Sequence, residues 1–143
     1  MATMRAAKLV DTRLTTVVAR SVAVILTLAT AAIHASLGGM LFVMTAAGYT
    51  TLALAMVLPG PFGRFRWLVR LGLIGFTAAT IGGWILFGAR FSLAYLDKAI
   101  ELALIAAVTF DLWQADGGPI QVARRLRTLA AGLAWTLAGR ARP

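Results

Sequence analysis

Long uncharged stretches dominate the pattern of hydrophobic and polar positions along this chain. No residue from 21 to 58 carries a formal charge, and as one helix this run would be roughly 57 Å long. The hydrocarbon core of a bilayer is only about 30 Å thick, so the run must fold back on itself. Gly38 and Gly39 suit a tight reversal. The pattern therefore predicts two membrane-spanning helices, over residues 18–36 and 40–58.

Two further apolar segments follow a break at Pro59, Gly60 and Pro61. They predict spans over residues 67–87 and 93–113, joined by a short turn. A Gly-Gly-Pro sequence at 117–119 then ends the fourth span, with Pro119 well placed to open another helix. We therefore expect an all-α integral membrane protein whose residues 1–116 form an up-down four-helix transmembrane bundle.

Residues 117–143 are predicted to form a basic cytoplasmic tail helix that does not cross the membrane. Its uncharged run, 128–139, is too short to span. Apolar residues recur at helical spacing behind a basic start, as they do in helices that lie on an anionic lipid surface. The apolar stripe is Val122, Leu126, Leu129, Leu133 and Leu137, and the basic residues are Arg124, Arg125 and Arg127.

Composition and charge support a membrane protein. Hydrophobic residues make up 60% of the chain and charged residues 13%, against about 25% charged in soluble domains. With the N-terminus in the cytoplasm, Arg90 and Lys98 are the two external residues among the 14 Lys and Arg. This asymmetry predicts a bacterial inner membrane protein with both termini cytoplasmic. The basic residues flank apolar runs and do not alternate with aromatics, so nucleic acid is not an expected partner.

The first 35 residues have the basic start and apolar middle of a signal peptide, with a possible cleavage motif at 29–31. We expect the segment to be retained, because the second span follows at once.

The fourth span carries an unusual set of charged residues: Asp97, Lys98, Glu101 and Asp111. The three acids share one helix face, within an arc of about 80°. Each charge at bilayer depth costs at least about 2.5–3.5 kcal/mol, so this face should point into the bundle. Lys98 can pair with Glu101 along the helix. His34, the one histidine, lies near the outer end of the first span, where it can meet Asp97 and Glu101.

These residues form a candidate polar intramembrane cluster with two interpretations. It could bind a metal, haem or chlorophyll through His34 or serve a proton path, or it could be a structural clamp. One histidine with carboxylates is a weak metal set, and there are no cysteines. A proton path needs groups across the bilayer, yet Asp111 lies about 15 Å from Glu101. We expect the clamp, with no metal and no cofactor; haem or chlorophyll at His34 is the alternative.

Small residues recur along the third span. Such spacing lets helices approach closely, so we predict packing within the chain or, alternatively, docking onto another subunit. The residues are Gly75, Ala78, Ala79, Gly82 and Gly83.

Two stretches, Ile33 to Phe42 with Ala47 to Tyr49, and Tyr95 to Glu101, resemble a class of small four-helix bacterial membrane proteins without an assigned activity. The resemblance implies that His34, Asp97, Lys98 and Glu101 belong to a shared pattern.

Three functions are compatible with the sequence. The first is an accessory subunit that packs against a larger respiratory or photosynthetic membrane complex, or against itself. The second is a small oligomeric transporter or channel component that uses the acidic face of the fourth span. The third is a haem- or chlorophyll-binding protein. There is no Ser–His–Asp arrangement, phosphate-binding glycine loop or HExxH motif, so we do not expect an enzyme.

Overall fold

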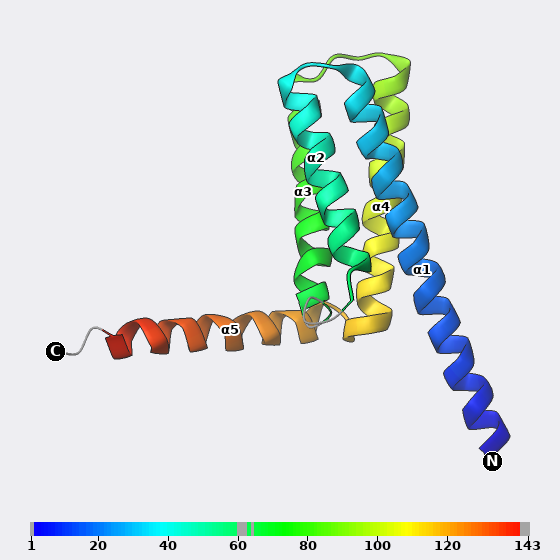
Figure 1. The fold of residues 1–143 in the computed structure, drawn as a ribbon, viewed down its shortest axis with the longest axis vertical. Coiled ribbons are helices and arrows are strands. Elements are labelled where there is room, and N and C mark those ends of the chain that lie inside the picture. Colours follow the sequence, from blue (N-terminus) through cyan, green and yellow to red (C-terminus); the bar gives the residue numbers. More distant parts are fainter. Residues whose placement is uncertain (1, 60–62, 64, 141–143) are drawn as a thin grey trace.

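The computed structural model describes residues 2–59, 63 and 65–140, and in this part of the chain every regular element is an α-helix (Figure 1). The first predicted span and its basic lead-in form one continuous helix. Gly60 and Pro61 of the predicted break, and the basic residues Arg64 and Arg142, lie outside the described residues. The five helices are α1 (Ala2–Leu37), α2 (Met40–Val57), α3 (Arg66–Phe87), α4 (Ser92–Asp116) and α5 (Pro119–Arg140).

Helices α1 to α4 lie side by side and run alternately up and down (Figure 1). Helix α1 packs mainly against α2 and α4, and α3 packs mainly against α4. The connections α1–α2 and α3–α4 meet at one end, which we call the turn end. Helix α5 leaves the opposite end almost at a right angle, and its main contacts with the other helices are with α4.

Pairs of glycines form two of the connections. Gly38 and Gly39 have φ of 71° and 80°, and Gly117 and Gly118 have φ of 78° and 88°. A side chain disfavours this left-handed region, whereas glycine enters it freely. The reversal predicted at Gly38 and Gly39, and the break predicted after the fourth span, are thus where the backbone turns.

The interior is made of one main apolar cluster and a small one. Tyr49, Met56, Leu73, Leu104 and Val108 are the larger buried residues of the main cluster, and they come from α2, α3 and α4. Helix α1 contributes small alanines to it, which bring its backbone close to the others. In the second cluster, Val122 of α5 packs with Trp67 and Leu112.

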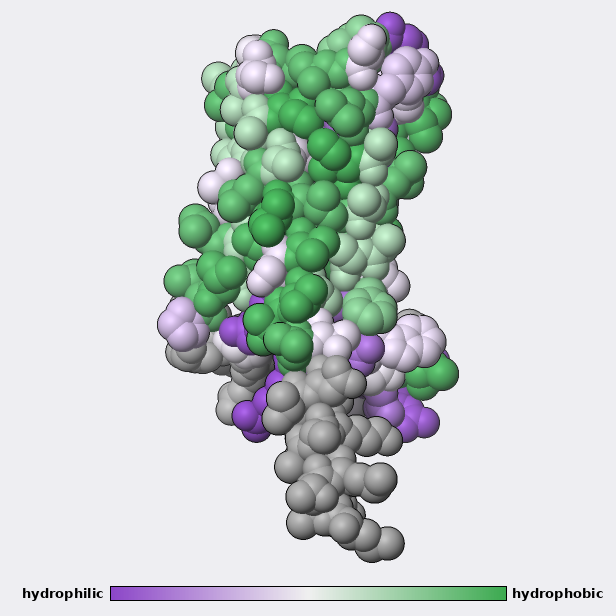
Figure 2. Space-filling view, turned by 90° about the vertical axis from the view of Figure 1, so that its right-hand side faces the viewer, coloured by the Kyte–Doolittle hydropathy of each residue, from purple (hydrophilic) through white to green (hydrophobic). Residues whose placement is uncertain are grey.

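Three helical segments are long and apolar enough to cross a membrane: Arg13–Leu37, Met40–Val57 and Arg66–Phe87. Large apolar side chains are exposed along these helices. Figure 2 shows hydrophobic residues over most of the height of one face, with hydrophilic residues toward both ends and more of them at the end where α5 begins. Helix α4 is not among the three because its charged residues interrupt the apolar sequence.

Candidate functional site: a buried charged cluster beneath a cavity

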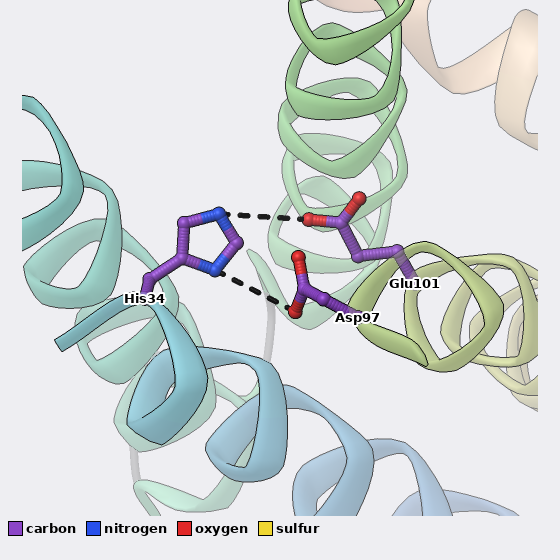
Figure 3. Close-up of side chains that lie close together, drawn as sticks. All are labelled: His34, Asp97 and Glu101. Carbon is purple, nitrogen blue, oxygen red and sulfur yellow. Dashed lines mark ion pairs between the residues drawn. The ribbon is translucent and has the colours of Figure 1, made fainter. Parts of the chain in front are cut away.

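The turn end holds a buried group of ionisable side chains, His34, Asp97, Lys98 and Glu101, which we call the turn-end cluster. His34 comes from the last turns of α1, and the other three come from the first half of α4. Figure 3 shows the imidazole of His34 pointing between the two carboxylates. The structure thus brings together four of the five residues that the sequence analysis singled out.

Lys98 bridges the two acids. Its Nζ lies 2.5 Å from Oε2 of Glu101 and 3.0 Å from Oδ2 of Asp97. The i,i+3 pair predicted between Lys98 and Glu101 is therefore present. With a neutral imidazole, the two carboxylates and one ammonium leave a net charge of −1 in a buried site.

Three hydroxyl groups, from one tyrosine and two threonines, lie within hydrogen-bonding distance of the two remaining carboxylate oxygens. Tyr49 donates to Oε1 of Glu101 at 2.9 Å, and Thr80 lies at the same distance from that oxygen. Thr30 donates to Oδ1 of Asp97 at 2.5 Å. All four helices α1 to α4 therefore contribute to the site, since α2 carries Tyr49 and α3 carries Thr80.

The two ring nitrogens of His34 have different surroundings. Nδ1 lies 3.0 Å from the carbonyl oxygen of Thr30 and 3.7 Å from Oδ1 of Asp97. Because a carbonyl only accepts hydrogen bonds, Nδ1 carries the proton in this arrangement. Nε2 lies 3.9 Å from Oε1 of Glu101, which is too long for a hydrogen bond.

Asp111 does not join the turn-end cluster. It lies near the opposite end, where Arg70 donates from Nε to its Oδ2 at 2.7 Å and Nε of Arg20 lies 3.9 Å from the same oxygen. Arg70 also donates to Asp116 at 2.9 Å, and Arg125 donates to Asp116 at 2.8 Å. We call these five residues the basal clamp; it joins α1, α3, α4 and α5.

A partly open cavity of about 590 Å³ lies at the turn end, between the ends of α2 and α3. Its walls are apolar and rich in aromatic rings, among them Phe42, Phe76 and Trp84. Three charged or ionisable members of its lining, His34, Asp97 and Lys98, belong to the turn-end cluster. This combination of an apolar wall with a few convergent polar groups is typical of small-molecule sites.

A cation lies beside one wall of the cavity. The guanidinium carbon of Arg90 is 4.4 Å from the centre of the Trp84 ring, and its Nη2 donates to the carbonyl of Ile85. Tyr95 meets Trp84 edge to face, at 5.2 Å between ring centres. These contacts hold Trp84 in place at the cavity wall.

The small residues of α3 border open space in the part of the chain that the structure describes. A Cβ atom built on Gly75, Gly82 or Gly83 meets no atom within 4 Å, and Ala78 and Ala79 are exposed. Ala79 and Gly83 line the cavity. The close approach instead occurs at Gly48 of α2, where a Cβ would lie 2.6 Å from the tip of the Phe76 ring.

The basic residues at the start of α5 divide into two kinds. Arg124 and Arg127 are exposed. Arg125 is half-exposed and is held by Asp116, so it also fixes the corner between α4 and α5.

Sequence reasoning missed the hydroxyl partners Thr30 and Thr80, and the pairing of Asp111 with Arg70. It also did not identify Tyr49 as a partner of Glu101. The pairing of Arg70 with Asp111 could have been predicted from the sequence. Both residues are charged, both lie within apolar segments, and the two segments should place them at the same level.

The geometry gives no support to an axial tetrapyrrole at His34. A haem or chlorophyll ring would have to lie across Nε2, where the Glu101 carboxylate is 3.9 Å away. His34 is also buried, with 5% of its surface exposed. A comparison with known proteins finds no match to a family model, to a curated protein or to a solved structure.

Proposed function

We propose that the chain is an integral membrane protein in which α1 to α4 all cross the bilayer, and that it binds a small amphipathic molecule in the turn-end cavity. The charges of α4 do not oppose a crossing, because Asp97, Lys98, Glu101 and Asp111 are all buried inside the molecule. The outward face of α4 carries Leu96, Leu102 and Phe110 instead. A helix with this distribution presents an apolar surface to lipid.

The excess of basic residues at one end supports an orientation with both termini in the cytoplasm of a bacterial cell and the turn end outside. The chain has no cysteines, so single cysteines can be introduced without a background. Gly38→Cys and Ala89→Cys should react with an impermeant maleimide added to intact cells. Thr128→Cys on α5 should react only after permeabilisation. The opposite pattern would overturn the orientation.

The functional proposal rests on the cavity, because its lining combines apolar and aromatic side chains with three members of the turn-end cluster. Its volume is within the range of about 300–1,000 Å³ found for small-molecule sites. A ligand with an apolar body and one polar group would match both parts. Such molecules dissolve in the bilayer, from which the outer ends of α2 and α3 are reached directly.

The polar group of this ligand should be a hydrogen-bond acceptor. Both oxygens of Asp97 already accept hydrogen bonds or ion pairs, from Thr30 and Lys98. The ammonium of Lys98 has three N–H donors, and its two carboxylate partners leave one for a ligand. A carboxylate is the acceptor that such a donor binds most strongly, through a charge-assisted bond.

Quenching of Trp84 tests this proposal. A protein with Trp67→Phe, Trp113→Phe and Trp135→Phe keeps Trp84 alone in the cavity wall. Dodecanoic acid brominated at its end should quench Trp84 saturably, and the matching brominated alcohol and amine should bind more weakly. Removal of the Lys98 donor in Lys98→Met should weaken the acid by roughly tenfold or more, since a hydrogen bond to a charged group contributes about 1.5–3 kcal/mol.

A second protein serves as the control. It carries Trp84→Phe and keeps the three other tryptophans, all outside the cavity lining. Its quenching should rise with the amount of brominated acid in the lipid and should not saturate. Equal, unsaturable quenching of Trp84 by acid, alcohol and amine would show partition into lipid and would rule out the binding site.

The open face of α3 favours a second candidate, an accessory subunit that docks onto another membrane protein. A Cβ added to Gly75 or Gly82 meets no atom of the described residues within 4 Å, and helices in lipid associate through small residues of this kind. Gentle solubilisation and native electrophoresis should then show co-migration with a large complex. Gly75→Leu with Gly82→Leu should release the chain, whereas Leu102→Ala on α4 should not.

A further inference from the structure

We infer that the turn-end cluster binds one divalent transition-metal ion through His34, Asp97 and Glu101. One nitrogen or oxygen of each residue lies within 4.8 Å of one from each of the others, and all three side chains are buried. Figure 3 shows the three groups converging from α1 and α4. Bonds of about 2.0–2.2 Å to one ion would draw them closer by modest side-chain rotations.

The histidine is already oriented as a metal ligand. Nδ1 donates to the carbonyl of Thr30 at 3.0 Å, so in the neutral imidazole it is Nε2 that carries the lone pair. Metal-binding histidines almost always use one ring nitrogen for such a hydrogen bond, which fixes the tautomer of the other. Without a cation, the Nε2 lone pair faces a carboxylate oxygen of Glu101 across 3.9 Å with no hydrogen between them.

Each carboxylate keeps an oxygen available on the side of His34. Lys98 holds Oε2 of Glu101 and Oδ2 of Asp97, whereas the oxygens recorded near His34 are Oε1 and Oδ1. Oε1 of Glu101 accepts from Tyr49, and the single hydroxyl hydrogen of Thr80 can be donated either to this oxygen at 2.9 Å or to the carbonyl of Thr77 at 2.8 Å. When Thr80 donates to Thr77, one lone pair of Oε1 remains for a metal ion. Oδ1 of Asp97 has one protein donor, Thr30.

The charge of the cluster also calls for a cation. When the imidazole is neutral, two carboxylates and one ammonium leave a net charge of −1, in surroundings where an unbalanced charge is costly. A divalent ion changes this to +1, and one anionic ligand in the fourth position makes the site neutral. Asp97 and His34 line the cavity, so that position faces the cavity; its occupation by a ligand carboxylate is the one step that rests on the proposed function.

The donor set selects the class of ion. One imidazole nitrogen with carboxylate oxygens suits Zn²⁺, Mn²⁺ or Fe²⁺, whereas Mg²⁺ and Ca²⁺ prefer oxygen alone. Three protein ligands with a fourth position left open are the arrangement of metal sites that also bind a small molecule.

Metal binding can be measured on the purified full chain, without any organic ligand. Co²⁺ should give a saturable visible absorption with one ion per chain, and Zn²⁺ should displace it while Mg²⁺ does not. Zn²⁺ should also raise the temperature of unfolding, because an ion that binds only the folded state stabilises it. His34→Gln, Asp97→Asn and Glu101→Gln should each weaken Zn²⁺ binding at least tenfold.

Two further variants keep the result interpretable. Asp116→Asn removes an acid of the basal clamp and should leave Co²⁺ binding unchanged. Lys98→Met removes the competing positive charge and should tighten Zn²⁺ binding, and Zn²⁺ should rescue this variant if it is unstable alone. Absence of the Co²⁺ band in the wild-type chain, or a band that survives His34→Gln, would overturn the metal site. Trp84 quenching without metal tests the organic ligand separately.

Discussion

Arg70 of α3 donates from Nε to Oδ2 of Asp111 of α4 across 2.7 Å, and each side chain has 2% or less of its surface exposed. The pair lies within the apolar part of both helices, one turn or more from their ends. Among the described residues, removal of Arg70 leaves the buried Asp111 with only Arg20, at 3.9 Å, and removal of Asp111 leaves Arg70 with only Asp116. A buried charge that has lost its closest partner is more costly than the loss of both partners together. This relationship makes the basal clamp a specific determinant of how α3 and α4 align.

A double-mutant cycle on this pair should therefore be strongly non-additive. Arg70→Met alone and Asp111→Leu alone should each lower the free energy of unfolding by about 3 kcal/mol, the lower end of the range for a broken buried pair, because Arg20 or Asp116 keeps part of the compensation. The combined variant should lose much less than the sum, since two apolar side chains replace the pair. The measurement is reversible unfolding in mixed micelles, and additive losses would show that the two charges are not coupled.

The helix contact at Gly48 gives a second prediction. A Cβ there would lie 2.6 Å from the Phe76 ring, which itself meets Tyr49 edge to face at 4.9 Å between ring centres. Gly48→Ala should thus displace an aromatic ring and destabilise the fold by about 1–3 kcal/mol. Gly75→Ala is the matched control, because its Cβ meets nothing within 4 Å. It should be neutral or stabilising by up to about 1 kcal/mol in thermal unfolding.

The helices themselves could be predicted because their signals are local. The uncharged run from 21 to 58 is too long for one crossing, and the glycines at 38 and 39 mark where it reverses. The break near Pro119 and the helix after it follow from the same rules. What these signals do not fix is which helix lies beside which, since the neighbours of a helix depend on packing among segments far apart in the sequence.

The candidate site was predictable in part for the same reason. A single helix face unites Asp97 and Glu101, and depth in the membrane brings His34 to the same level. Asp111 also shares that face, but it lies about 15 Å along the axis from Glu101, so a second polar cluster forms around it. The shared helix face alone therefore groups Asp111 with Asp97 and Glu101, although its position along the helix axis separates it from them. The hydroxyl donors Tyr49 and Thr80 come from α2 and α3, whose rotation about their own axes no local pattern sets.

The hydrogen bond from Tyr49 to Glu101 gives a third prediction. Tyr49→Phe keeps the ring and removes a donor to a buried carboxylate at 2.9 Å. A hydrogen bond to a charged group contributes about 1.5–3 kcal/mol, so the loss of stability should be in that range. Tyr95→Phe should cost much less, because Tyr95 is 53% exposed. A comparison of the two variants in the same thermal assay checks the prediction; equal losses would mean that the hydroxyl of Tyr49 contributes nothing specific.

Helix α5 should lie on the membrane surface by a combination of charge and apolar contact. It leaves the other helices almost at a right angle (Figure 1), and beyond Val122 its apolar residues, including Leu133 and Trp135, are exposed. In a protein that keeps Trp135 as its one tryptophan, emission should shift to the blue in nanodiscs of anionic phosphatidylglycerol and less so in phosphatidylcholine. High salt should reverse the shift, because it screens the attraction between arginines and lipid.

Charge reversal at the start of α5 separates this electrostatic contribution from contact within the protein. Each basic residue near an anionic surface contributes about 1 kcal/mol, so Arg124→Glu with Arg127→Glu should abolish the shift of Trp135. Arg90→Glu, at the turn end, is the matched control and should preserve it. Arg125 is left intact in both, since its bond to Asp116 holds the corner from which α5 departs. If Trp135 is equally blue-shifted in neutral lipid, at high salt and after charge reversal, α5 is held by apolar contact alone, and the basic residues serve only the orientation of the chain.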